Sequence, residues 1–136
     1  MKYLIDTHTF LWFGTDDIQL PQRVRSIIED ADNDISISVA SLWEIGIKNS
    51  LGKLPLPNGI LGLEREANDL AIGILPITAT TINQITLMPL HHKDPFDRII
   101  AATALTQSHI LLSADTIFDA DKVVRVWDSR GDKSIA

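Results

Sequence analysis

Two short hydrophobic runs, separated by a segment of helical periodicity, open the chain. Residues 2–5 form a mainly apolar run that stops at Asp6, and residues 35–38 alternate between apolar and polar side chains. Both patterns predict β-strands. Between them, residues 21–31 carry apolar side chains at helical spacing, with Pro21 at the first helical position. The opening pattern is therefore strand, helix, strand.

The rest of the chain continues this alternation. Residues 38–51 contain no proline, start with serines at 38 and 41 that can cap a helix, and are followed by Gly52, which favours a helix end. We also predict helices over 60–71, 78–87 and 95–107, and strands over 74–77, 110–112 and 123–127. Helices that separate short, β-branched, apolar strands are typical of a parallel sheet covered on both faces. Functional residues of such sheets lie at the carboxyl ends of the strands.

Length and composition fit one globular domain. The chain has 136 residues, of which 45% are hydrophobic and 22% charged, which argues against a disordered, collagen-like or coiled-coil protein. We expect a domain over residues 1–128 and a polar tail over 129–136. No run approaches the roughly 18 apolar residues of a membrane span, and Asp6 and His8 interrupt the N-terminal apolar segment. Neither a membrane segment nor a secretory signal is predicted.

Cysteine content and charge narrow the chemistry further. The chain has no cysteine, which excludes a disulfide framework, a thiolate zinc site and a cysteine nucleophile, and favours a reducing cytoplasm. With 12 Lys and Arg against 18 Asp and Glu, the net charge of −6 argues against a protein that coats nucleic acid by charge alone. The positions of the acids matter more than their number.

Four acidic residues follow strands or lie early in the helices after them. Asp6 and Asp115 follow strands directly or within three residues, whereas Glu44 and Asp97 lie early in helices. Because parallel strands end at one edge, we expect all four there. Two carboxylates about 4 Å apart repel by about 4 kcal/mol at an effective dielectric constant of about 20. A hard divalent cation, Mg²⁺ or Mn²⁺, would offset this repulsion.

Each acid also has a structural interpretation. Asp94 directly precedes a proline and can cap the following helix, in whose first turn Asp97 would interact favourably with the helix dipole. Asp115 can be a turn residue. Glu44 can form a surface ion pair with Lys48, four residues later. Both interpretations of these residues stay open at this point.

Four motifs, in order along the chain, carry a family resemblance. They are LIDTHTFLW at 4–12, SVASLWEI at 38–45 with LGKL at 51–54, HKDPFDRIIAA at 92–102, and LSAD at 112–115. They span nearly the whole chain and closely resemble a PIN domain, more narrowly the VapC-type toxin ribonucleases of VapBC toxin–antitoxin modules. The resemblance implies a single α/β domain in three layers, α/β/α, with a short parallel sheet in the order 3-2-1-4-5.

The resemblance also implies an activity, that of a metal-dependent endoribonuclease. Mg²⁺ or Mn²⁺ activates a water that attacks an RNA phosphodiester, leaving a 5′-phosphate and a 3′-hydroxyl. The acids implied as catalytic residues and metal ligands are Asp6, Glu44, Asp97 and Asp115. The fourth acid varies within the family, and Asp119 lies nearby. Thr7 occupies a hydroxyl position often found after the first Asp, whereas Ser113-Ala114 replaces a more usual Thr and polar residue.

Partners implied by the resemblance are an RNA substrate, a second copy of the chain in a homodimer, and a small antitoxin protein near the acidic edge. Basic residues near the predicted mouth can bind phosphates or simply solubilise the surface; they are Lys48, Lys53, His91, His92, Lys93 and Arg98. His8 can orient a carboxylate, meet the substrate or serve a structural role. We interpret Trp12 and Trp43 as core or interface residues rather than base-stacking platforms.

Three other interpretations fit parts of the sequence. A receiver-like phosphotransfer domain also places acids at strand ends, but Asp6 is not followed two residues later by a second carboxylate, and no lysine stands at 113–115. His91 and His92 are adjacent, so they are poorly placed as an acid–base pair on opposite sides of a phosphate. A catalytically inactive PIN-like interaction or regulatory module remains the alternative, which the presence of all four acids disfavours.

Overall fold

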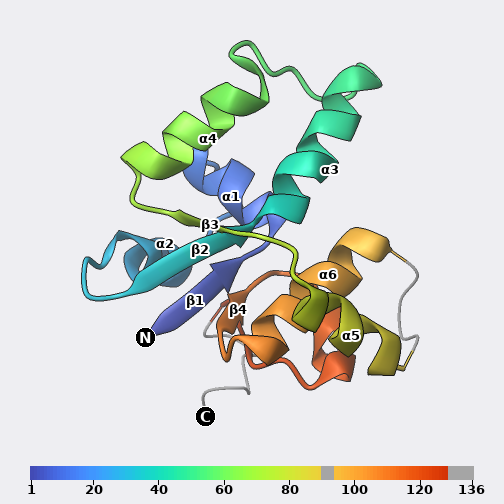
Figure 1. Cartoon of the computed structure of the whole chain (residues 1–136). Coiled ribbons are helices and arrows are strands. Elements are labelled where there is room, and N and C mark those ends of the chain that lie inside the picture. Colours follow the sequence, from blue (N-terminus) through green and yellow to red (C-terminus); the bar gives the residue numbers. More distant parts are fainter. Residues whose placement is uncertain (90–93, 129–136) are drawn as a thin grey trace.

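The central feature of the fold is a five-stranded parallel sheet in the order β3-β2-β1-β4-β5 (Figure 1). The computed structural model describes residues 1–89 and 94–128. The strands are β1 (Lys2–Ile5), β2 (Asp34–Ser38), β3 (Gly73–Leu75), β4 (Ile110–Leu112) and β5 (Arg125–Val126). The predicted single α/β domain and its strand order are confirmed. The predicted tail over 129–136 lies outside the described residues.

The three central strands end within one residue of the same level, because β2 continues one residue beyond Ile37, to Ser38. Ile5, the last residue of β1, is paired with Ile37 of β2 on one side and with Leu112 of β4 on the other. The residues that follow these strands therefore emerge side by side at one edge of the sheet.

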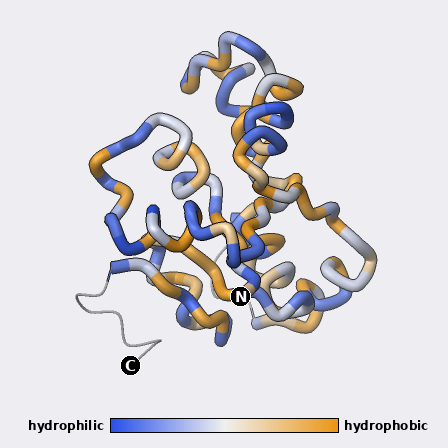
Figure 2. Tube along the Cα trace, turned by 90° about the vertical axis from the view of Figure 1, so that its left-hand side faces the viewer, coloured by the Kyte–Doolittle hydropathy of each residue, from blue (hydrophilic) through white to orange (hydrophobic). Residues whose placement is uncertain are grey.

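Helices cover both faces of the sheet. Successive strand side chains point to opposite faces, so the apolar strands contribute apolar side chains to each face. The helices are α1 (Thr7–Gly14), α2 (Gln22–Glu29), α3 (Val39–Ser50), α4 (Gly59–Asp69), α5 (Ala79–Leu87) and α6 (Pro95–Thr106), with a 3₁₀ helix η1 (Thr116–Asp121). Ile5 and Leu112 pack in one core with α1 to α4, whereas Leu4 and Leu111 pack in a second core with α6 and η1. Figure 2 shows hydrophobic and hydrophilic positions interspersed along these helices, as expected where one face is buried.

The predicted elements are present, with ends that agree within two residues. Pro21 is the N-cap of α2 rather than its first helical residue. Strand β3 ends before Pro76, which has no N–H to donate to a neighbouring strand. Helices α1 and η1 were not predicted. Helix α1 (THTFLWFG) is rich in β-branched and aromatic residues of low helix propensity, so its sequence carries little helical signal.

Among the described residues, no helix is long and apolar enough to cross a membrane.

Candidate active site

Asp6 is a buried carboxylate at the end of β1, where it is also the N-cap of α1. Its Oδ1 accepts hydrogen bonds from the Thr9 backbone N–H at 2.9 Å and from the Thr9 hydroxyl at 2.6 Å. Its Oδ2 accepts a hydrogen bond from the Ser113 hydroxyl at 2.5 Å. Burial raises the pKa of Asp6, although the hydrogen bonds from Ser113 and Thr9 act in the opposite direction.

The hydroxyls of Ser113 and Thr9 join the end of β4 to Asp6. Ser113 donates to Asp6 and accepts from the Asp115 backbone N–H at 3.0 Å, so this one hydroxyl links two of the predicted acidic positions. The Thr9 hydroxyl lies near both Asp6 and the Leu112 carbonyl oxygen, which is 3.0 Å away. Its single proton can serve one of these acceptors at a time.

Glu44 lies in the second turn of α3, where its carboxylate is linked to both Thr7 and Lys48. Its Oε1 accepts a hydrogen bond from the Thr7 hydroxyl at 2.6 Å, and its Oε2 lies 3.6 Å from the Lys48 ammonium. The surface pair considered from the sequence is therefore present, but the carboxylate is also tied to the residue next to Asp6. The Glu44 side chain is 15% exposed.

Both ends of α3 are fixed by specific caps. Ser38 accepts a hydrogen bond from the Ala40 N–H at 3.0 Å, so the first of the two predicted cap serines is the N-cap. At the other end, Gly52 has a φ of +73°, and the N–H groups of Gly52 and Lys53 donate to the carbonyls of Asn49 and Lys48. This is a Schellman motif, which needs glycine at the left-handed position. The predicted roles of Ser38 and Gly52 are confirmed.

Asp94 and Asp97 begin α6 as the sequence predicted. The Asp94 carboxylate accepts hydrogen bonds from the N–H groups of Phe96 at 2.9 Å and Asp97 at 3.4 Å, so its capping role is confirmed. Asp97 is half-buried in the first helical turn. Phe96 packs edge-to-face on Trp43, with ring centroids 5.2 Å apart. The chain neighbours of Asp97 and Glu44 are thus in contact.

Asp115 is exposed and caps η1, because its Oδ1 accepts a hydrogen bond from the Ile117 N–H at 3.0 Å. This agrees with the turn interpretation and leaves a metal-binding role as a prediction. Asp119, the nearby alternative, forms a two-bond ion pair with Arg125, at 2.9 and 3.1 Å. Arg125 also donates to the Ser113 carbonyl at 3.0 Å, which fixes the end of β4 against β5.

The arrangement brings some predicted residues together directly and others only indirectly. Asp6 accepts hydrogen bonds from the hydroxyls of Thr9 and Ser113. Glu44 is connected to Asp6 only through Thr7, which follows Asp6 in the chain and donates to Glu44. Over the described ranges 1–89 and 94–128, no three His, Asp or Glu side chains are grouped closely enough to hold one metal ion. A shared site of four carboxylates therefore stays a prediction.

The donors present nevertheless fit a hard divalent cation. They are oxygen atoms only, and Mg²⁺ is often held by one or two carboxylates while keeping several waters. Asp6 is buried at a cost to its charged form, as its raised pKa indicates. A cation near it would favour that charged form.

The supporting residues named from the sequence occupy varied environments. The Arg98 guanidinium donates to the Ile85 carbonyl at 3.1 Å, which ties α6 to the last turns of α5. His8 is exposed, and its ring lies 5.6 Å from that of Trp12. His91, His92 and Lys93 lie outside the described residues. The sequence analysis did not identify Ser113 and Thr9 as contacts of Asp6. For Thr9, the available signal was a hydroxyl three residues after a possible N-cap.

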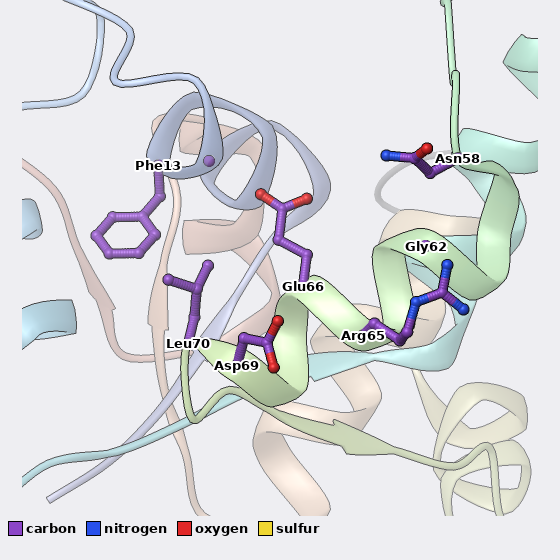
Figure 3. Close-up of a pocket in the computed structure, with 8 residues that line it drawn as sticks. Phe13, Asn58, Gly62, Arg65, Glu66, Asp69 and Leu70 are labelled. Carbon is purple, nitrogen blue, oxygen red and sulfur yellow. The ribbon is translucent and has the colours of Figure 1, made fainter.

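Two surface hollows lie beside α3 and α4. One, of about 500 Å³, lies between α3 and the start of α6 and is lined by Glu44, Lys48 and Phe96 among others. The other, of about 520 Å³, lies between the end of α1 and α4 (Figure 3). Its lining includes Phe13, Arg65, Glu66 and Asp69 and none of the four predicted acids. The first hollow is therefore the one that adjoins the candidate site.

Comparison with known proteins agrees with the resemblance. The PIN domain family model matches residues 3–122. Ribonuclease VapC22 of Mycobacterium tuberculosis is 27% identical over 114 residues, a match that covers 82% of this chain and 85% of that relative. Ribonuclease VapC16 of the same organism is 51% identical over 35 residues, a match that covers 26% of this chain and 25% of that relative.

Solved structures show the same fold. VapBC2 from Rickettsia felis, bound to a DNA fragment from its promoter, matches with a TM-score of 0.68 at 15% identity and covers 94% of this chain and 100% of the matched chain. VapBC-1 from nontypeable Haemophilus influenzae matches with a TM-score of 0.66 at 15% identity, and the match covers 93% of this chain and 97% of the matched chain.

Proposed function

Since the chain belongs to the PIN domain family, we propose that it is the toxin of a VapBC-type module, an endoribonuclease that uses Mg²⁺ or Mn²⁺ to hydrolyse RNA phosphodiester bonds. The observation that carries the proposal is the buried Asp6 carboxylate, held at the carboxyl edge of the sheet by Thr9 and Ser113, while the next residue, Thr7, donates a hydrogen bond to Glu44. Curated relatives that match the chain are named ribonucleases.

Each side chain of the site has a role in this proposal. Ser113 and Thr9 hold the two oxygens of Asp6 in fixed directions, and Thr7 does the same for one oxygen of Glu44. Together with Asp97 and Asp115, which we expect at the same edge, these carboxylates would hold the metal ion. A bound divalent ion supplies an activated water and offsets negative charge that develops on the phosphate. Lys48, beside Glu44, is placed to contact a flanking phosphate.

The proposed partners are an antitoxin protein and a second copy of the chain. Support for an antitoxin comes from solved neighbours that are VapBC assemblies. A cationic side chain of such an antitoxin, placed among the carboxylates, would compete with the metal ion. A short reading frame encoding a small protein directly before this gene would support the toxin assignment.

The test is cleavage of structured RNA, including tRNA, by the whole chain. We expect cleavage with Mn²⁺, none with EDTA, and a loss of at least about 100-fold for Asp97→Asn and Asp6→Asn, as for removal of groups that stabilise a transition state. The matched control is Asp69→Asn on α4, an exposed acid away from the site.

Full cleavage in EDTA would overturn the metal-dependent mechanism. If the wild-type chain cleaves no RNA with Mn²⁺, the inactive interaction module becomes the better description. Products ending in a 5′-phosphate and a 3′-hydroxyl are expected, and a 2′,3′-cyclic phosphate would indicate a different reaction.

A further inference from the structure

One guanidinium, that of Arg125 on β5, holds both ends of the segment 113–119 that follows β4. Its Nη1 donates to the Ser113 carbonyl oxygen at 3.0 Å. Its Nε and Nη2 donate to the two carboxylate oxygens of Asp119, in η1, at 2.9 and 3.1 Å. We call these three hydrogen bonds the Arg125 clamp. Because a guanidinium is planar and rigid, the clamp fixes both ends of the segment relative to β5.

The clamped segment contains residues of the candidate site. The Ser113 hydroxyl donates to Asp6 at 2.5 Å and accepts the Asp115 N–H at 3.0 Å. Ser113 is therefore held by its hydroxyl on Asp6 and by its carbonyl on Arg125. Hydrogen bonds run without interruption from Asp119, through Arg125 and Ser113, to the buried carboxylate of Asp6.

The charges and exposure of the clamp favour a geometric role. The Arg125 side chain is 14% exposed, and its charge is paired at contact distance with the half-exposed Asp119. Such a pair has no net charge with which to attract RNA phosphates, and ion pairs that reach the solvent contribute little to stability. The effect we expect from the clamp is therefore on the position of the segment 113–119.

We propose that Arg125 is a positioning residue of the candidate site, which holds the segment 113–119 where the Ser113 hydroxyl reaches Asp6. This inference rests on the proposed ribonuclease function. It also assigns Asp119, the alternative fourth acid, to the clamp rather than to the metal ion, since both of its carboxylate oxygens accept from Arg125. Lysine cannot replace this arginine, because a single ammonium does not present donors to both acceptors in the same fixed plane.

The first test is amide hydrogen exchange by NMR in EDTA, which needs neither metal nor substrate. In Arg125→Lys, the N–H groups of Asp115 and Ile117 should exchange at least about tenfold faster than in the wild type, because the segment that holds their acceptors is released. The matched control is Arg25→Lys, which changes another partly buried arginine, paired with Asp16 at 2.8 Å. It should leave exchange at both positions unchanged.

RNA cleavage with Mn²⁺ then distinguishes positioning from contact with the substrate. Arg125→Lys should lower kcat about tenfold, as for other groups that orient a metal ligand, and leave KM within about twofold. The salt dependence of KM should stay unchanged, because the guanidinium does not bind a phosphate. Asp119→Asn keeps one acceptor oxygen and should lower kcat by less, whereas Arg25→Lys should cleave like the wild type.

A double variant tests whether Arg125 acts through Ser113. In the Ser113→Ala background, Arg125→Lys should cause a much smaller further loss of kcat, because both changes disturb the same hydrogen bond to Asp6. Losses that multiply in full would overturn the inference. If Arg125→Lys does not fold, Asp119→Asn, which leaves the bond to the Ser113 carbonyl in place, is measured for exchange and for kcat in its stead.

The remaining outcomes separate this inference from the ribonuclease function. If the wild type cleaves no RNA, that function fails, and the inference fails with it. If the wild type cleaves and Arg125→Lys cleaves equally well, only the inference is overturned. A raised KM with a flatter salt dependence and an unchanged kcat would make Arg125 a phosphate contact and would also overturn it. So would a loss of Mn²⁺ binding, measured by electron paramagnetic resonance, in Asp119→Asn but not in Arg125→Lys.

Discussion

The Ser113 hydroxyl, at the end of β4, makes two hydrogen bonds. It donates to the buried carboxylate of Asp6 and accepts the N–H of Asp115. Sequence comparison with the family pattern marked position 113 as a departure, because serine stands in place of threonine. The hydroxyl that both residues share is the part that contacts Asp6, so this departure keeps the hydrogen bond.

Removing this hydroxyl should weaken both the fold and the site. Ser113→Ala takes away a donor that lowers the pKa of Asp6, so that pKa should rise further. We expect the free energy of unfolding to fall by about 2 kcal/mol. In RNA cleavage with Mn²⁺, the acidic limb of the pH profile should move to higher pH, and Ser113→Thr should restore it.

The control for this variant is Ser26→Ala, which removes an exposed serine hydroxyl of α2. It should change neither unfolding nor the pH profile. A Ser113→Ala protein with an unshifted acidic limb would mean that the hydroxyl does not act on Asp6.

Residue chemistry was the part of the site that the sequence predicted best, and contacts were the part it could not supply. Asp6 stands out because it directly follows a strand, and Glu44 stands out because it is a charged residue in an otherwise apolar helical segment. The bond between Ser113 and Asp6 joins positions 107 apart, and no local pattern encodes such a pairing. Its prediction would require the register that places Ile5 beside Leu112.

At the scale of elements, the helices with clear caps were predicted well. Helix α6 starts at Pro95 as expected, because Asp94 and the proline form a strong N-terminal signal. Helix α1 was missed because it is stabilised by its surroundings. Asp6 caps it, and Phe10 packs into the core, whereas its residues alone favour extended structure.

Substitutions of Asp94 can separate the capping of α6 from a role of this residue in RNA cleavage. Asp94→Ala should lower the free energy of unfolding by about 1 kcal/mol, the usual cost of losing an N-cap, as measured by urea denaturation. Asp94→Asn keeps a capping oxygen and should lose much less. RNA cleavage by Asp94→Asn should stay near that of the wild type.

Equal destabilisation by both Asp94 substitutions would show that the charge, rather than the cap, stabilises α6. A cleavage defect in Asp94→Asn as large as that in Asp97→Asn would place Asp94 among the catalytic residues.

At the scale of the whole molecule, the buried carboxylate opposes folding when no cation is present. Burial raises the pKa of Asp6 above its ordinary value of 3.8, so the folded chain holds this proton more tightly than the unfolded chain. The contribution of Asp6 to stability is therefore greatest below pH 3.8 and is lost as pH rises through the higher, folded-state pKa. At neutral pH the charged form makes the fold less stable.

Asp6→Asn removes this titration, and the Ser113 hydroxyl can turn to accept from the amide. In EDTA at neutral pH, we expect the variant to unfold at a higher temperature than the wild type, with the difference shrinking below about pH 3.8. Adding Mn²⁺ should raise the Tm of the wild type more than that of the variant. A lower Tm for the variant in EDTA at neutral pH would mean that its lost hydrogen bonds outweigh the cost of burying the charge.

Strands β1, β2 and β4 end within one residue of the same level. The two edges of the sheet therefore differ in how well they tolerate insertions and deletions. One residue added between Ile5 and Asp6 would turn the carboxylate to the other face of the sheet, because side chains alternate along a strand. One residue added at 30–33, before β2, would only lengthen a loop at the opposite edge. Changes in chain length during evolution should therefore accumulate at the edge away from Asp6, while the other edge keeps its spacing.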